Sequence, residues 1–172
     1  MNRWSPALAV AVSLLVAGCG SDNPTAPTAT KPTFTAAMSA ANEVPPITNA
    51  ESGARGTATI VFNTTVAGGQ ITAATADFTV NLTGLPPNTT ITASHIHPGA
   101  VGVNGGVVVN LGLTAGEIVT NASGAATITK NGIAVDAALA QTIINNPAGY
   151  YFNSHSTLNG GGVARGQLVR TQ

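Results

Sequence analysis

The sequence predicts an all-β fold, an antiparallel β-sandwich that carries one short helix. Charged residues make up only 7% of the chain, against about 25% in a typical soluble domain, so the surface must be built from Thr, Asn, Ser and Gly. Those residues, together with abundant Val and Ile, suit an antiparallel sheet with one solvated face. Short segments of strand composition alternate with turn signals, which is typical of a sandwich or a barrel.

The first expected strands are joined by a tight turn. Residues 57–62 are rich in β-branched and aromatic side chains, which favours a strand. Residues 71–82 alternate apolar with polar side chains, the period of a strand with one buried face. Two adjacent glycines within residues 66–70 indicate a hairpin turn between them. Two prolines within residues 84–88 end the second strand, because proline cannot donate to a central ladder.

Five further strands and one helix are expected in the rest of the chain. The strands are residues 90–97, 106–111, 125–129, 150–155 and 163–169. The helix is expected over residues 136–146, where Asp136 suits an N-cap and Pro147 follows as a stop. Leu139 and Ile143 give this helix an apolar stripe. Residues 34–172 leave room for one domain with one core.

The first residues indicate export. Arg3 precedes a mainly apolar stretch at residues 7–17, and small residues follow. A positive start, a short apolar region and small residues before a cleavage point are the parts of a signal peptide. Residues 1–18 are therefore expected to be a signal peptide, since the apolar run is shorter than the ~20 residues that span a bilayer. Cys19 is the only cysteine, so no intramolecular disulfide can form.

Cys19 directly follows Val-Ala-Gly, which resembles the lipobox of bacterial lipoproteins. The resemblance implies that the signal peptide is removed before Cys19, that Cys19 is lipidated, and that the lipid anchors the chain to a membrane. An ordinary signal peptide with a chance cysteine is the alternative. Residues 20–33 are rich in Pro, Thr and Ala and are expected to be a disordered tether. The expected location is the bacterial cell envelope, at the outer membrane or the cell surface.

The composition also excludes several functions. Lys plus Arg number 6, Asp plus Glu number 6, and the formal net charge is zero. A nucleic-acid partner is not expected, because phosphate binding needs clustered Lys and Arg. The chain contains no nucleophile elbow, no phosphate-binding loop and no carboxylate pair.

The three histidines are the candidates for a metal site. His95 and His97 are two residues apart on an expected strand, so their side chains point to the same face. Two such imidazoles, roughly 6–7 Å apart along a strand, can converge on one ion. His155, on another expected strand, would complete a site for copper or zinc. The alternative is a structural role in which the ring nitrogens bind backbone carbonyls.

Two polar residues accompany the histidines. Asn153 is two residues before His155 and shares its face, so it is expected to orient a ring or to bind the backbone. Arg165 is expected to pair with Glu43 or to cap carbonyl groups. Both residues are therefore candidates for the surroundings of the metal site.

Four segments, in order along the chain, resemble the motifs of the CHRD domain, which is named after chordin and found in many bacterial exported proteins. They are NEVPP at residues 42–46, ASHIHPG at 93–99, YYFNSH at 150–155 and ARGQL at 164–168. The resemblance runs over about residues 34–169, so residues 34–172 are expected to be a CHRD domain. The family usually has Gly-Glu-Ile-Arg-Gly near its end, whereas Gly-Val-Ala-Arg-Gly at residues 162–166 lacks the glutamate.

A looser resemblance is to the copper/zinc superoxide dismutases, which are also β-sandwiches. A His-x-His strand, a later histidine and a Gly-x-Ala-Arg-Gly segment follow in the same order. The resemblance implies that His95, His97 and His155 are metal ligands and that Arg165 guides a small anion. That family uses four copper-liganding histidines and a zinc-site aspartate, so three histidines exclude a dinuclear site and leave a mononuclear copper site. The expected sandwich is therefore immunoglobulin-like or superoxide-dismutase-like.

Two functions are predicted from these observations, and the sequence leaves both open. The first is a membrane-anchored, exported CHRD lipoprotein that acts as a non-enzymatic binding or structural module toward an unknown extracellular or envelope protein. The second is a mononuclear three-histidine protein that binds copper or zinc and handles copper or performs redox chemistry. The first follows from the family resemblance and the second from the histidine pair.

Overall fold

The computed structural model describes residue 1 and residues 26–172. The expected signal peptide and Cys19 lie outside these residues, so both stay predictions. Within the described part of the chain, no helix is long and apolar enough to cross a membrane. The described residues form eleven strands and one α-helix, with two short 3-10 helices. The bounds are β1 Thr28–Thr30, β2 Thr33–Ser39, η1 Ala40–Asn42, β3 Arg55–Ala67, β4 Gln70–Thr83, β5 Thr90–Pro98, β6 Val109–Asn110, β7 Ile118–Val119, β8 Ala126–Val135, α1 Ala137–Asn145, η2 Pro147–Gly149, β9 Tyr150–Ser156, β10 Ala164–Gln167 and β11 Val169–Arg170.

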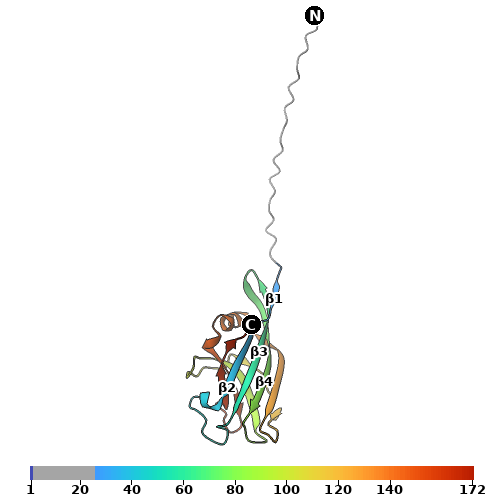
Figure 1. The fold of residues 1–172 in the computed structure, drawn as a ribbon. Helices are drawn as coiled ribbons and strands as arrows, with labels where there is room; N and C mark the ends of the chain where they lie inside the picture. The colour runs from blue at the N-terminus through green and yellow to red at the C-terminus, as the bar shows by residue number, and fades with distance from the viewer. Residues whose placement is uncertain (2–25) are drawn as a thin grey trace.

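The strands form one antiparallel sheet in the order β6-β5-β9-β10-β2-β3-β4-β8, and β2, β3 and β4 run side by side in Figure 1. The sheet folds over on itself, because strands far apart in this order meet across the core. Phe78 of β4 and Phe152 of β9 have ring centroids 6.0 Å apart. This confirms the expected all-β, sandwich-like fold.

Local sequence explains the β3–β4 hairpin and the helix. Gly68 and Gly69 have φ angles of 58° and 77°, the left-handed values that a two-residue hairpin turn requires. Asp136 caps α1 by accepting a hydrogen bond from the backbone N–H of Leu139 at 2.9 Å. Ile143 of α1 is buried against the sheet. Both the hairpin and the helix were expected, and both are confirmed.

Other strands differ from the expectation. The tether was expected to be disordered, yet Thr28–Thr30 pairs with residues 64–66 of β3. β3 extends beyond the end of β2 at this point, so its unpaired backbone groups are available to β1. β2 was not expected either, although Phe34 and Met38 alternate with polar residues and are buried. The segment 106–111 forms a strand only at Val109–Asn110.

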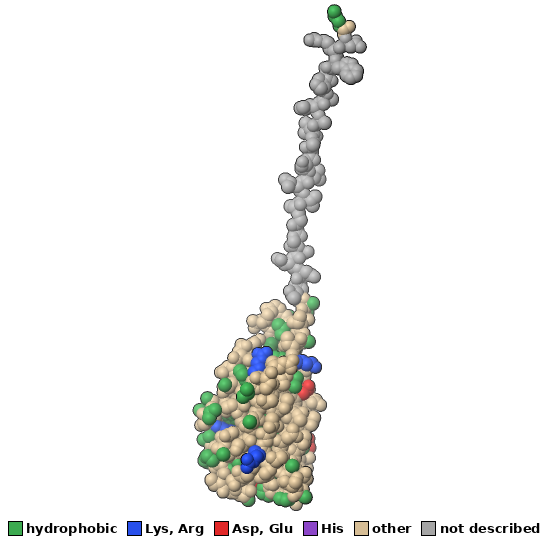
Figure 2. Space-filling model, in the orientation of Figure 1, with side chains coloured by type: hydrophobic (Ala, Val, Ile, Leu, Met, Phe, Trp, Pro, Cys, Tyr) green, Lys and Arg blue, Asp and Glu red, His purple; other side chains and the backbone are tan. Residues whose placement is uncertain are grey.

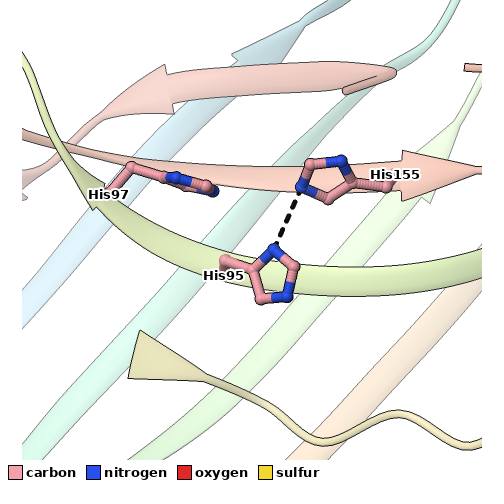
Figure 3. Close-up of side chains that lie close together, drawn as sticks. All are labelled: His95, His97 and His155. Atoms are coloured by element: carbon pink, nitrogen blue, oxygen red, sulfur yellow. Dashed lines mark hydrogen bonds between the residues drawn. The ribbon is translucent and has the colours of Figure 1, made fainter. Parts of the chain in front are cut away.

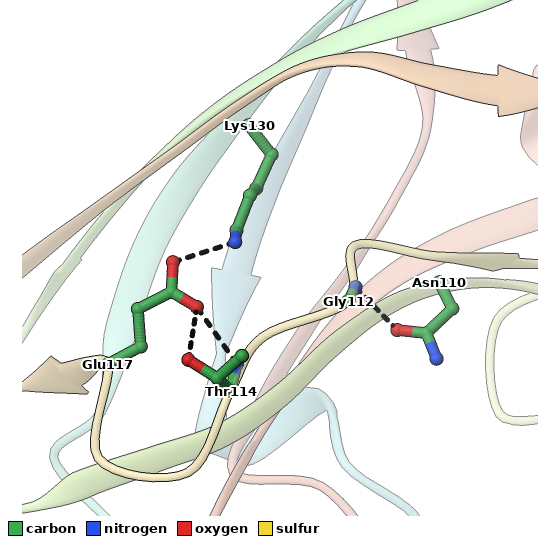
Figure 4. Close-up of polar contacts among 5 residues, drawn as sticks. All are labelled: Asn110, Gly112, Thr114, Glu117 and Lys130. Atoms are coloured by element: carbon green, nitrogen blue, oxygen red, sulfur yellow. Dashed lines mark hydrogen bonds and ion pairs between the residues drawn. The ribbon is translucent and has the colours of Figure 1, made fainter.

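Few charges lie on the surface, and one ion pair links two edges of the sheet. Figure 2 shows a face on which charged side chains are scattered among uncharged ones. Glu117 precedes β7, which pairs with β5, while β8 lies at the other edge of the sheet. The Glu117 Oε1 atom lies 2.7 Å from Nζ of Lys130 on β8 (Figure 4). Both side chains are partly exposed, so solvent screens the pair and it contributes little to stability.

Strand β9 carries several of the candidate site residues and is buried along its whole length. Burial on both faces fixes the positions of its side chains. One of its faces carries Phe152 into the hydrophobic core. The alternate face carries Tyr151, Asn153 and His155, each less than a tenth exposed. The loops that carry Gly105 and Gly160 contact this second face. It forms a buried polar layer, which is called the polar layer below.

The packing of Phe152 yields a stability prediction. Truncation by Phe152→Ala is expected to lower the free energy of unfolding by about 3–5 kcal/mol, because it empties the contact between β9 and β4. Urea denaturation with linear extrapolation measures the change. Val107→Ala is the control, since Val107 is 51% exposed and is expected to shift stability by less than about 0.5 kcal/mol. A loss below ~1 kcal/mol for Phe152→Ala would contradict the packing of β9 against β4.

Candidate metal site

The register of β5 and β9 brings the three histidines onto one face of the sheet. His95 lies opposite Asn153, and Ala93 lies opposite His155 in the antiparallel ladder. His95 and His97 are two residues apart and point the same way, as expected from the period of a strand. His155 joins them from the neighbouring strand (Figure 3). The structure therefore brings together all three histidines that the sequence singled out.

The three rings are close enough to share one ion. One ligand nitrogen from each histidine lies within 4.8 Å of the other two. The shortest separation is 3.1 Å, between Nδ1 of His95 and Nε2 of His155. Ligands about 2.0–2.1 Å from one ion, in trigonal or tetrahedral geometry, stand roughly 3.3–3.6 Å from each other. Small ring movements are therefore sufficient for three-nitrogen coordination.

Two backbone carbonyls fix the tautomers of His97 and His155. The Nδ1 atom of His97 lies 3.0 Å from the carbonyl oxygen of Gly105, and that of His155 lies 3.1 Å from that of Gly160. A carbonyl can only accept, so both Nδ1 atoms carry the proton and both Nε2 atoms carry a lone pair. The Nε2 atom of His97 is buried without a partner among the described residues. The structural role and the ligand role thus fall on different nitrogens of the same rings.

His95 completes the cluster differently. Its Nδ1 atom faces the Nε2 lone pair of His155, so it carries the proton of that hydrogen bond. To act as a ligand through Nδ1, His95 must move this proton to Nε2. His95 is more exposed than His97 and His155, which leaves room for that exchange with solvent. His95 is therefore the one candidate ligand of the three whose ring must change tautomer before it binds an ion.

The cluster keeps its histidines neutral. Burial, with smaller contributions from charge on His155 and His97, lowers the pKa of His95 to about 4. Burial also lowers the pKa of His97 and of His155, against the opposing effect of their carbonyl partners. Neutral imidazoles are the form that binds metal ions. All three rings are therefore in the charge state that metal binding requires at neutral pH.

Arg165 lies in the same polar layer. It was expected either to pair with Glu43 or to cap carbonyl groups, and it caps carbonyl groups. It is 2% exposed. Its Nε donates to the carbonyl of Asn42 at 2.8 Å, and its Nη1 donates to Oδ1 of Asn104 at 2.7 Å. No ion pair joins it to Glu43 among the described residues, although its charge acts on that carboxyl group. The guanidinium carbon lies 4.5 Å from the ring centre of Tyr151.

Asn153 and Glu43 are buried, and neither is hydrogen-bonded to a histidine ring. Asn153 is 3% exposed and Glu43 is 5% exposed. Neither Oδ1 of Asn153 nor Oε1 of Glu43 has a hydrogen-bond partner in the described part of the chain. Asn153 was expected to orient a ring or to bind the backbone, and neither hydrogen bond is present among the described residues. The carbonyl groups of Gly105 and Gly160 accept from the rings of His97 and His155. Only the glycine-rich composition of the two loops could have pointed to those carbonyls.

Glu43 gives a pH-dependent prediction. Burial raises its pKa from 4.5 to about 7, and the charge of Arg165 opposes the rise. The folded state therefore binds the Glu43 proton more tightly than the unfolded state does. The resulting contribution to the free energy of unfolding is fully present below pH 4.5 and is lost as the pH rises through 7. Glu43→Gln is expected to gain stability relative to the natural protein between pH 5 and pH 8 in urea denaturation. Glu117→Gln is the control, because the pKa of Glu117 is lowered to about 2, so no such gain should develop. An equal effect of Glu43→Gln at both pH values would contradict the buried carboxyl.

Comparison with known proteins places the chain in a family. A comparison with curated proteins found no significant match. The profile of the CHRD domain matches residues 34–168, which contain all three histidines and the arginine beside them. This match covers most of the chain and confirms the resemblance drawn from the four sequence motifs. The chain belongs to the CHRD domain family.

Proposed function

We propose that this protein is an exported metal-binding CHRD module that holds one copper ion with His95, His97 and His155. A lipid on Cys19 anchors it at the bacterial cell envelope. The observation that carries the metal assignment is the convergence of three imidazole nitrogens within 4.8 Å. CHRD membership supports a non-enzymatic module in general, and the metal site gives that module a cargo.

The buried lone pair of His97 Nε2 favours a metal over a purely structural cluster. A buried acceptor without a partner costs about 1–3 kcal/mol, and apolar side chains of similar size would avoid this cost. The outward nitrogens of His97 and His155 are already bound to carbonyls. That is the usual arrangement of metal-binding histidines, whose second nitrogen is held by a carbonyl or carboxylate. The inward nitrogen of His97 is therefore left for an ion, and that of His155 becomes available when the proton on Nδ1 of His95 moves.

Copper is the better candidate for the ion, and zinc is the competitor. Nitrogen ligands bind divalent copper more tightly than the other first-row divalent ions, zinc included. The cluster contains only histidines among the described residues, and neutral imidazole suits both metals. We therefore assign a role in copper handling, in which the domain binds the ion and holds it at the envelope. The envelope-protein partner expected from the family stays a prediction.

The proposal predicts stoichiometric binding. Calorimetric titration of the purified full chain in mild detergent is expected to give one copper ion per chain with micromolar or tighter affinity. His95→Ala/His97→Ala is expected to weaken binding at least a hundredfold, because it removes two of three ligands. Thr92→Ala is the matched control, since Thr92 is exposed on the same strand.

Two results would contradict the metal assignment. One is an absence of copper and zinc binding by a folded natural chain. The other is binding that the double substitution leaves unchanged, which would place the ion elsewhere. Near-ultraviolet circular dichroism of each variant separates loss of ligands from loss of fold.

The proposed lipid anchor predicts that membrane association depends on Cys19. In a bacterial host that processes lipoproteins, the natural chain is expected in the membrane fraction, with a mass that includes the lipid. Cys19→Ser is expected to move most of the protein to the soluble fraction, because a lipid supplies the membrane affinity. Ser21→Ala is the control in the same segment. Retention of Cys19→Ser in membranes, or a natural chain without lipid mass, would contradict the anchor.

A further inference from the structure

Three side chains from consecutive strands form a stack that ends at the histidine cluster. His97 is on β5, Tyr151 is on β9 and Arg165 is on β10, and these strands are neighbours in the sheet. The rings of His97 and Tyr151 are stacked, with centroids 4.9 Å apart and planes 6° from parallel. The guanidinium carbon of Arg165 lies 4.5 Å from the centre of the Tyr151 ring. Because β9 is the middle strand, Tyr151 lies between the other two side chains.

The positive charge of Arg165 is buried without an ion-pair partner among the described residues. Its hydrogen bonds go to uncharged acceptors, the carbonyls of Asn42 and Val103 and the side-chain oxygen of Asn104. No carboxylate lies within ion-pair distance of it among the described residues. The buried carboxylate of Glu51 is bound instead to Ser156 and Asn159. The carboxyl group of Glu43 interacts with the charge of Arg165, but burial raises its pKa to about 7, so at neutral pH it offsets that charge only in part. The stack therefore has an incompletely compensated cation at one end.

This charge acts on the histidines through a region that excludes water. Tyr151 is 2% exposed and His97 is 6% exposed, so solvent screening between Arg165 and the cluster is weak. The cost of adding a positive charge to the cluster rises in proportion to that charge. A divalent ion is therefore penalised twice as much as a monovalent one. The three ligands are neutral, so they do not offset the second charge.

We infer that the cargo of this site is monovalent copper, Cu(I), and that Arg165 selects it over divalent ions through the Tyr151 stack. This inference rests on the proposed metal site. Arg165 is a positioning and selectivity residue, because it does not contact the ion. The neutral ligand set and the buried cation both favour the ion of lower charge.

The test compares affinities for the two oxidation states of copper in the full chain. Cu(I) binding is measured without oxygen against the coloured chelator bicinchoninate, and Cu(II) binding is measured against nitrilotriacetate. Arg165→Met is expected to lower the ratio of Cu(I) to Cu(II) affinity roughly tenfold, as a unit charge at this range implies. A tenfold decrease in that ratio lowers the one-electron reduction potential of the bound copper by about 59 mV. Arg165→Lys is expected to retain most of the ratio.

Arg170→Met is the matched control, since Arg170 is exposed on β11 and its loss should leave the ratio unchanged. Binding of neither copper ion by the folded natural chain would defeat the proposed metal site itself. Binding of both ions with a ratio that Arg165→Met does not change would overturn only the selection by Arg165. If Arg165→Met does not fold, voltammetry of the natural chain decides. A midpoint potential above that of aqueous copper supports Cu(I), and one below it overturns the inference.

Discussion

The position of β9 between β5 and β10 is the constraint on which the rest of the structure depends. Its register places Phe152 in the core and His155 in the polar layer on the opposite face. A slip by one residue would exchange the two faces, because side chains alternate along a strand. The packing that fixes the core therefore also fixes the site. Accurate placement of the three imidazoles is a consequence of the fold.

Several of the few charged residues of this chain are buried in the interior of the domain. Glu43, Glu51 and Arg165 are each at most 5% exposed, although charged residues are only 7% of the chain. Arg165 and Glu51 are held by hydrogen bonds to uncharged groups. Buried charge is costly unless it is well bonded, so its retention beside the histidines points to function. The carbonyls of Gly105 and Gly160 set two ring tautomers before any ion arrives, which lowers the ordering needed on binding.

The sequence predicted what local patterns determine. The alternation of residues 71–82, the glycine pair of the hairpin and the Asp136 cap each act over a few residues, and each is found. The shared face of His95 and His97 follows from the same period. The approach of His155 could only be a hypothesis, because it depends on which strands become neighbours. The carbonyl partners and the stack on Tyr151 depend on loops and strands far apart in the sequence, and no pattern within one segment contains them.

The central claim is that two carbonyls preset the histidines as neutral rings with inward lone pairs. Nitrogen-15 NMR of the metal-free chain at pH 7 tests this directly, since the chain has only three histidines to assign. The account predicts that all three rings are neutral and that His97 and His155 carry their protons on Nδ1. Charged rings at pH 7, or protons on Nε2 of His97 and His155, would contradict it.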